Sequence, residues 1–335
     1  MSALLSVEDL RVTFKRHGEE AFPAVDGVSF DVHPGQTVGL VGESGCGKSV
    51  TALAIMGLLP SRGNRVEGAA SYEGVNLLGL SASQMRDRRG RDIAMIFQDP
   101  LSSLNPVVPI GVQVTEVMER HNGMSRKAAM PHARDLLERV GIPDPGARLK
   151  NYPHQLSGGM RQRALIAMAL ACSPRLLIAD EPTTALDVTI QAQILALLKE
   201  LVQEIGTALI MITHDLGVVA GLCDEVNVLY AGRIVERGDR HGLFAQPRHP
   251  YTHGLLGSIP RLDAPRGEKL NPVPGSVSDN LPWTSACAFA PRCSHVLDVC
   301  RKKTPEWEWE SGQRGLRCHN PVEPQPVDTR EVGHE

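Results

Sequence analysis

The sequence predicts an α/β fold in which a parallel sheet is joined to an inserted helical subdomain and a small cysteine-rich C-terminal extension. Three observations in the 335 residues predict it. A glycine-rich segment at residues 42–49 lies between a short apolar run and a helical pattern. Two further apolar runs, 176–180 and 208–213, end in polar residues and flank an amphipathic segment. Four of the seven cysteines lie in the last sixth of the chain.

The glycine-rich segment has a strand before it and a helix after it. Gln36–Val41 reads as a buried strand and Val50–Leu59 as a helix. The loop between them follows the pattern of a glycine, four free positions and Gly-Lys-Ser/Thr. Its glycines let backbone N–H groups converge on phosphate oxygens, and the helix N-terminus favours negative charge. We expect Lys48 to contact the β- and γ-phosphates of a nucleotide and the Ser49 hydroxyl to ligate Mg²⁺. The expected nucleotide contacts are Gly42, Ser44, Gly45, Cys46, Gly47, Lys48, Ser49 and Val50.

A pair of carboxylates follows the second apolar run. Leu176–Asp180 has the length of a central strand in a parallel sheet, and Glu181 comes directly after it. Ligands bind at the carboxyl ends of the strands in open α/β sheets. We therefore expect Asp180 to contact Mg²⁺ through water and Glu181 to be the base that polarises the attacking water. The alternative is an exposed acidic pair at a strand end.

The third apolar run, Ala208–Thr213, leads directly into His214. Residues 188–205 carry apolar side chains at helical spacing, and Gly206 suits the helix C-cap. The segment therefore reads as strand, helix and strand, with polar groups at both strand ends. This position predicts that His214 contacts the γ-phosphate.

The segment Leu156–Met160, Leu-Ser-Gly-Gly-Met, resembles the signature sequence of the ATP-binding-cassette (ABC) ATPases, with Met where Gln is commoner. Ile96–Gln98 resembles the Q-loop of that family, and His214 matches its switch histidine. The resemblance covers about residues 5–245. It implies a P-loop ABC ATPase core that hydrolyses ATP to ADP and phosphate.

The resemblance also implies a role for each matching residue. Glu181, His214 and Gln98 are expected to be catalytic, and Gln98 is expected to join Ser49 and Asp180 at Mg²⁺. Phosphoryl transfer depends mainly on positioning and charge stabilisation, which suits such a set.

Members of the family stack two subunits head to tail, so that each ATP lies between one subunit's phosphate loop and the signature of the other. The residues expected to contact the partner's nucleotide are Ser157, Gly158 and Gly159. Family members also stack an aromatic ring near the N-terminus on adenine. Phe14 and Phe22 both qualify, and the insertion at residues 17–20 leaves the choice open; Phe14 is preferred.

These motifs and the composition divide the chain into three parts. Residues 1–97 and 156–245 form the nucleotide-binding core, 98–155 the helical subdomain, and 246–335 the C-terminal extension. The subdomain is either a packing unit or, as the resemblance implies, a unit that also receives a coupling helix from a membrane subunit. The Pro- and Gly-rich connector at 246–282 is expected to separate the cysteine tail from the phosphate loop.

Four further segments resemble the ATP-binding subunits of bacterial dipeptide/oligopeptide importers. They are Asp99–Pro106, Tyr152–Gln155, Arg248–Thr252 and Ala290–Cys293. This resemblance implies import of di- or oligopeptides by a complex of several proteins. The expected partners are a homologous second ATPase that completes a heterodimer, two transmembrane permease subunits and, indirectly, a periplasmic or extracellular peptide-binding protein. One alternative is import of nickel, glutathione or an opine. Another is a soluble ABC ATPase outside transport, although such proteins usually carry two cassettes or a long coiled-coil insertion.

The bulk composition indicates where the protein works. A net charge of −3 argues against a nucleic-acid partner held by a basic face. Apolar residues make up 42% of the chain, yet no apolar run reaches the roughly 18 residues of a membrane span. The N-terminus lacks the form of a signal peptide. We expect a peripheral protein on the cytoplasmic side of the inner membrane.

The C-terminal cysteines suggest a metal site. Five residues separate Cys287 from Cys293, six separate Cys293 from Cys300, and seventeen precede Cys318. This spacing lacks the paired CxxC of zinc ribbons, but four thiolates can bind zinc or a [4Fe–4S] cluster. The larger cluster suits looser spacing, and the peptide-importer resemblance also implies an iron–sulfur cluster here. Zinc and no metal remain open.

Overall fold

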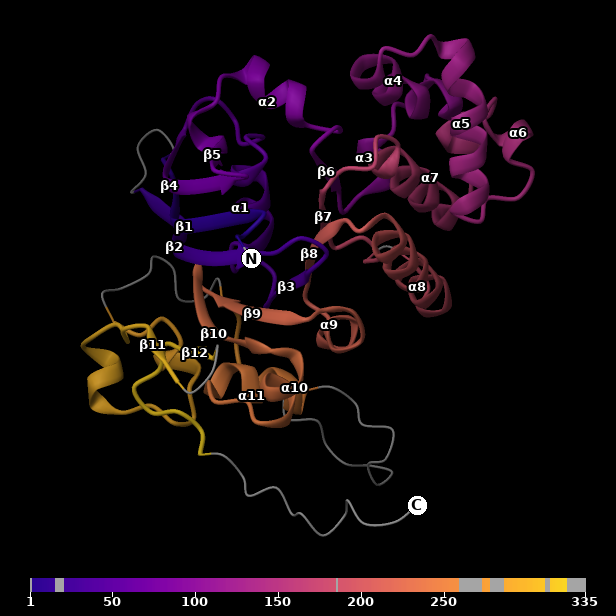
Figure 1. Cartoon of the computed structure of the whole chain (residues 1–335). Helices are drawn as coiled ribbons and strands as arrows, with labels where there is room; N and C mark the ends of the chain where they lie inside the picture. The colour runs from indigo at the N-terminus through magenta and orange to yellow at the C-terminus, as the bar shows by residue number, and fades with distance from the viewer. Residues whose placement is uncertain are drawn as a thin grey trace.

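An eight-stranded sheet forms the core of the molecule (Figure 1). The computed structural model describes residues 2–15, 21–184, 186–258, 273–277, 286–310 and 314–323. The strands follow the order β11-β12-β10-β9-β3-β8-β7-β6. The neighbours that run parallel are β9 (Glu225–Tyr230), β3 (Thr37–Val41), β8 (Ala208–Thr213), β7 (Leu176–Asp180) and β6 (Ile93–Ile96). This parallel sheet confirms the predicted α/β class.

Burial on both faces explains why the central strands are so apolar. Every residue of β7, β8 and β9 is buried. Alternate side chains of β7 enter two different cores: Leu176 and Ile178 pack with the N-terminal sheet, whereas Leu177 and Ala179 pack with the helices. A parallel sheet is stable only when both faces are covered in this way.

Helices cover one face of the large sheet, and a second sheet lies over the other. The second sheet is antiparallel, in the order β2-β1-β4-β5. Its strands are β1 (Leu5–Phe14), β2 (Phe22–Val32), β4 (Asn64–Tyr72) and β5 (Val75–Asn76), followed by η1 (Leu77–Gly79) and α2 (Ala82–Arg88). Helix α1 (Lys48–Ile55) packs between the two sheets. On the opposite face lie α8 (Val188–Ile205) and α9 (Leu216–Leu222).

The strand–helix–strand unit expected between residues 176 and 213 is confirmed. Helix α8 begins at Val188 and ends at Ile205, and its C-cap Gly206 adopts φ +73°, a left-handed conformation. Glycine takes this conformation without steric penalty. The unit carries the chain from β7 to its neighbour β8.

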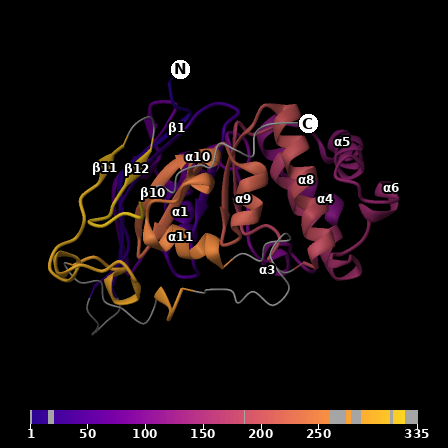
Figure 2. The same cartoon turned by 90° about the horizontal axis from the view of Figure 1, so that it is seen from below.

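Residues 100–155 form a separate group of short helices at one end of the molecule, far from β11 and β12 (Figures 1 and 2). The helices are α3 (Pro100–Ser103), α4 (Ile110–Asn122), α5 (Arg126–Arg139), α6 (Pro145–Arg148) and η2 (Pro153–Gln155). The next helix, α7 (Gly158–Leu170), packs against α3, α4 and α5 and also contacts α8 and β6. It therefore ties the helical group to the sheet.

The C-terminal extension continues the large sheet at its edge. Strand β10 (Arg233–Asp239) pairs with β9, and β12 (Gly315–Leu316) pairs with β10 and with β11 (Glu308–Trp309), all antiparallel. Between them lie α10 (Arg240–Ala245), α11 (Pro250–Gly257), η4 (Ala290–Arg292) and η5 (Asp298–Arg301). About half of the predicted connector at 246–282 falls outside the described residues. The described part is not an extended segment: it includes helix α11, whose residues Pro250, Tyr251 and Thr252 are buried. Within the described ranges, every helix is too short or too polar to cross a bilayer.

A buried histidine begins α11 inside the extension. His249 is 2% exposed, and its Nδ1 accepts a hydrogen bond from the Tyr251 backbone N–H at 3.0 Å. The His249 backbone N–H in turn donates to the buried Glu236 carboxylate at 2.9 Å. Burial lowers the pKa of His249 to about 3, although its hydrogen bond to the backbone of Arg317 opposes the shift. The neutral ring is therefore part of the folded structure.

We predict that the free energy of unfolding falls as the pH drops below about 6.5, because the unfolded histidine binds a proton that the folded ring cannot. The contribution of His249 approaches about 1.4 kcal/mol per pH unit between the two pKa values. The variant His249→Asn keeps an acceptor for the helix N-terminus but does not titrate. The free energy of unfolding, measured with urea at about pH 7.5 and about pH 5.5, should fall less between the two pH values in the variant than in the wild type. Equal drops in both proteins contradict the assignment.

Candidate functional site

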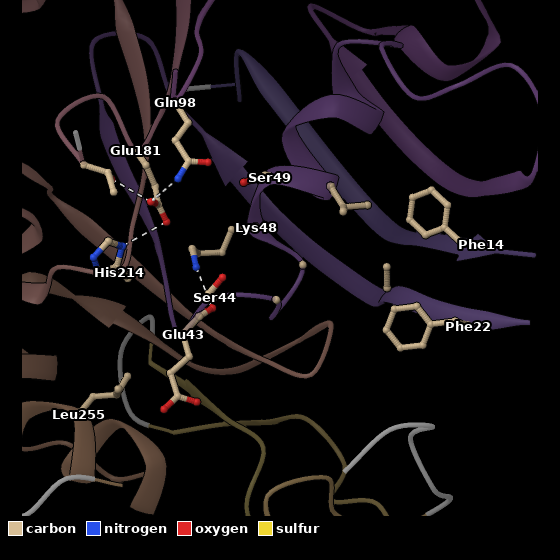
Figure 3. A pocket seen from close by; sticks show the side chains of 15 residues that line it. Phe14, Phe22, Glu43, Ser44, Lys48, Ser49, Gln98, Glu181, His214 and Leu255 are labelled. Carbon is tan, nitrogen blue, oxygen red and sulfur yellow. Dashed lines mark hydrogen bonds and ion pairs between the residues drawn. The ribbon is translucent and has the colours of Figure 1, made fainter. Parts of the chain in front are cut away.

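A cavity of about 730 Å³ opens at the carboxyl ends of β3, β6, β7 and β8 (Figure 3). The loop between β3 and α1 forms its floor, and residues from the ends of β6, β7 and β8 form one wall. The lining residues are Phe14, Phe22, Ala24, Glu43, Ser44, Gly45, Gly47, Lys48, Ser49, Val50, Gln98, Glu181, Thr184, His214 and Leu255.

The loop between β3 and α1 passes so close to two strands that only glycine fits at two positions. Gly42 has φ +151°, and a Cβ there would lie 2.2 Å from the carbonyl oxygen of Leu229. Gly47 has φ +103°, and its Cβ would lie 2.5 Å from the carbonyl oxygen of Ala24. Contacts this short displace the backbone, so these glycines set the path of the loop.

Lys48, the first residue of α1, is folded back onto the loop. Its Nζ donates to the carbonyl oxygens of Gly42 at 2.7 Å and Glu43 at 2.9 Å, and the side chain is buried. The Cys46 sulfur lies 3.7 Å from the same nitrogen, and burial raises the pKa of that thiol. The loop therefore places a single ammonium group at the floor of the cavity.

Ser49 and Asp180 meet beside this lysine. The Ser49 hydroxyl donates to Asp180 Oδ1 at 2.9 Å, although the two residues are far apart in sequence. Burial raises the pKa of Asp180, and the hydrogen bond from Ser49 opposes the rise. A hydroxyl next to a carboxylate is an oxygen donor set of the kind Mg²⁺ prefers. These residues therefore fit a magnesium ion bound with a phosphate ligand.

Glu181 is the centre of a hydrogen-bonded group drawn from three neighbouring strands. Its Oε2 accepts from Gln98 Nε2 at 3.0 Å and from the Thr184 hydroxyl at 2.9 Å. Its Oε1 lies 3.2 Å from His214 Nδ1 (Figure 3). Burial disfavours the charged carboxylate, but the hydrogen bonds from His214 and Thr184 outweigh it and lower the pKa of Glu181. Glu181 therefore stays ionised at neutral pH.

Two expectations from the sequence concern the aromatic ring that stacks on adenine and the signature segment. Phe14 and Phe22 both line the cavity and are partners across the β1–β2 pair, so neither is favoured as the adenine platform. The insertion at residues 17–20 lies outside the described residues. The signature residues Ser157, Gly158 and Gly159 start α7, where Ser157 and Gly158 are exposed, and are not among the described residues that line this cavity.

Sequence reasoning missed several residues around the cavity, among them Ala24, Glu43 and the four described next. Thr184 binds Glu181, and its position three residues later in the same turn was the available signal. The other three come from the extension. Tyr251 accepts the Glu43 backbone N–H at 2.8 Å, Leu255 lines the cavity, and Arg292 pairs with the Glu43 carboxylate at 2.6 Å.

The contact between Arg292 and Glu43 corrects one prediction. The connector was expected to separate the cysteine tail from the phosphate loop, yet Arg292, the residue before Cys293, is bonded to that loop. The prediction was wrong because it relied on distance along the sequence, whereas the extension folds back onto the sheet edge next to the loop.

The four C-terminal cysteines carry free thiols. Backbone N–H groups donate to the sulfurs of Cys293, Cys300 and Cys318 at 3.3 to 3.4 Å. Among the residues that the structure describes, however, no group of three or more His, Cys, Asp or Glu side chains is placed to hold a metal ion. The arrangement does not support the metal site predicted from the cysteine spacing.

Comparison with known proteins shows two regions of similarity. Residues 25–184 match the family described as "ABC transporter", and residues 235–300 match "Oligopeptide/dipeptide transporter, C-terminal region". The dipeptide transport ATP-binding protein DppD of Bacillus subtilis is 52% identical over 319 residues, covering 95% of this chain and 95% of the relative. The oligopeptide transport ATP-binding protein OppD of Escherichia coli is 50% identical, covering 96% and 94%.

Among solved structures, the chain is similar to the ATP-binding cassette MJ0796, a dimer in a post-hydrolysis state bound to ADP and Pi. The TM-score is 0.62 at 27% identity, and the match covers 70% of this chain and 98% of that one. The match takes in nearly all of that cassette, whereas about 30% of this chain lies outside it.

Proposed function

This chain belongs to the ABC transporter family as an ATP-hydrolysing subunit, and we propose that the ATP it hydrolyses drives the import of di- and oligopeptides. The observation that carries ATP hydrolysis is the grouping of Lys48, Ser49, Glu181 and His214 around one cavity. The match of residues 235–300 to the peptide-transporter C-terminal region supports peptides over nickel, glutathione or opines. Similarity to transport subunits along 95% of the chain argues against a soluble ABC ATPase outside transport.

We assign the binding roles from the contacts around the loop. Lys48 leaves its carbonyl partners Gly42 and Glu43 to contact the β- and γ-phosphates, which are stronger acceptors because they are charged. Ser49 and Gln98, with Asp180 through water, would hold Mg²⁺, which would neutralise charge on the phosphates. The other expected nucleotide contacts, from Ser44 to Val50, lie in the same loop and in the first turn of α1.

Glu181 is proposed as the base that takes the proton of the attacking water. Its ionised carboxylate is oriented by Gln98, Thr184 and His214, so it can accept a proton without first losing one. When a nucleotide enters, Gln98 and His214 are in reach of the phosphates and the water. A base held this way contributes to the rate mainly through its position.

The complete site needs a second subunit. Ser157, Gly158 and Gly159 start a helix away from the cavity, where an exposed helix N-terminus can meet the phosphates of another subunit. The dimeric state of MJ0796 supports a pair of such subunits. We propose a homologous second ATPase, two permease subunits and a peptide-binding protein as the partners, with no nucleic acid. The chain then lies on the cytoplasmic face of the inner membrane.

The three predicted parts are kept as proposed domains. Residues 1–97 and 156–245 hold the nucleotide, and 98–155 face the permease subunits. The extension, 246–335, carries the cysteines.

An iron–sulfur cluster remains a proposal for Cys287, Cys293, Cys300 and Cys318. The pKa of Cys318 is raised to about 12, mainly by burial and in smaller part by the charges of the three other cysteines. The four cysteines therefore lie within electrostatic range of one another. Backbone N–H donors at the sulfurs are the kind of contact that stabilises ligating thiolates. A [4Fe–4S] cluster spreads its irons over a few ångströms and suits thiolates that one ion cannot join. Such a cluster would have a structural or sensing role here, since ATP hydrolysis has no redox step.

The proposed function predicts that Glu181→Gln binds ATP but hydrolyses it about 100-fold or more slowly, because the water loses its base. Lys48→Ala should instead fail to bind ATP, because the main cation on the phosphates is gone. Nucleotide titration and single-turnover hydrolysis in the assembled transporter separate the two effects. Hydrolysis by Glu181→Gln at the wild-type rate contradicts the base assignment. ATPase activity that neither dipeptides nor oligopeptides change, with the peptide-binding protein present, contradicts the peptide assignment.

For the cysteines, we predict iron and acid-labile sulfide in protein purified without oxygen, with broad absorbance near about 400 nm. Replacing any one of the four cysteines by Ser should lower the iron content, whereas Cys172→Ser is the matched control and should not. Stoichiometric zinc without iron contradicts the cluster, as does the absence of both metals.

A further inference from the structure

An arginine of the extension forms a two-pronged ion pair with the phosphate loop. Arg292 Nη1 donates to Glu43 Oε2 at 2.6 Å, and Nη2 donates to Oε1 at 2.8 Å. The arginine side chain is 4% exposed and the glutamate 28%. A parallel pair of charge-assisted hydrogen bonds fixes both position and orientation. The contact joins residues that lie 249 positions apart in sequence.

The rest of the arginine is held rigidly by the extension and the sheet. Its Nε donates to the carbonyl oxygen of Pro274 at 2.6 Å, and Nη2 donates to that of Gly275 at 3.0 Å. Its guanidinium lies 5.7 Å from the ring centre of Tyr230 and 5.9 Å from that of Phe289. Because the Arg292 side chain is fixed by this many contacts, it can hold the Glu43 carboxylate in one place.

Glu43 is the residue of the phosphate loop whose carboxylate must be held in place. It lines the cavity, it follows Gly42 in the loop, and its carbonyl oxygen accepts from Lys48 Nζ at 2.9 Å. Its backbone N–H donates to Tyr251 of the extension. An unpaired carboxylate on this loop would repel the phosphates of a nucleotide and compete with them for Lys48.

We propose that Arg292 is a positioning residue for nucleotide binding: it neutralises Glu43 and holds that carboxylate away from the phosphates, so that the C-terminal extension sets the affinity of the loop for ATP. The inference rests on the proposed function in that the cavity binds a nucleotide. Because Arg292 directly precedes Cys293, a rearrangement of the cysteine segment reaches the nucleotide through this ion pair.

The test is a set of variants in the full chain: Arg292→Gln, Glu43→Gln and the double variant. Dissociation constants for ATP and ADP are measured by titration in the presence of Mg²⁺. Arg292→Gln should weaken ATP binding about tenfold, and ADP binding less, because the repulsion grows with phosphate charge. Glu43→Gln should bind ATP as tightly as wild type or more tightly. The double variant should return to within about threefold of wild type, because the unpaired carboxylate is gone.

Rescue by Glu43→Gln separates this role from a purely structural one. If Arg292 only holds the extension together, the double variant stays as weak as Arg292→Gln, and the proposal is overturned. If Arg292→Gln does not fold, Arg292→Met replaces it: methionine keeps much of the length of the side chain but removes its charge, so ATP binding should weaken, and Glu43→Gln should restore it. No weakening, or no restoration, also overturns the proposal.

Arg248→Gln is the matched control. Arg248 is a partly buried arginine of the same extension, it pairs with Glu310 at 3.1 Å, and it does not line the cavity. Its loss should lower the unfolding temperature without changing the ATP dissociation constant. A wild-type chain that binds no ATP contradicts the proposed function itself, which distinguishes that failure from a failure of the Arg292 role.

Discussion

The close approach of the phosphate loop to strands β2 and β9 is the constraint on which the site depends. A side chain at Gly42 would meet Leu229 at 2.2 Å, and one at Gly47 would meet Ala24 at 2.5 Å. Because the loop can follow only this path, α1 begins at Lys48, with Ser49 facing β7. The positions of the Lys48 ammonium and the Ser49 hydroxyl are therefore set by backbone packing rather than by the contacts of these side chains.

The order of the strands brings together the residues that surround Glu181. Strand β7 lies between β6 and β8, so the residue after its end is flanked by the residues that follow its neighbours. Glu181 therefore meets Gln98 on one side and His214 on the other. The carboxyl edge of a parallel sheet concentrates such groups because every strand there ends in the same direction. Hydrogen bonds among them keep the carboxylate charged in a half-buried place.

Local pattern predicted the parts of the structure whose causes are local. The strand, glycine loop and helix around Lys48, and the unit from β7 to β8, were evident in apolar spacing and glycine placement. Phe14 and Phe22 could not be separated because they face each other across one strand pair. The Arg292–Glu43 pair joins distant segments, and β12 has only two residues, so neither leaves a periodic signal. Cysteine spacing suggested a metal, but spacing does not fix how the described side chains converge.

We infer that the phosphate loop and the C-terminal extension form one nucleotide site. Hydrogen exchange of the full chain with and without ATP and Mg²⁺ tests it most directly, since exchange reports local opening along the whole backbone. We predict slower exchange in residues 42–49 and, in the same experiment, in α11 and residues 286–293. Slower exchange in the loop with no change in the extension would contradict it.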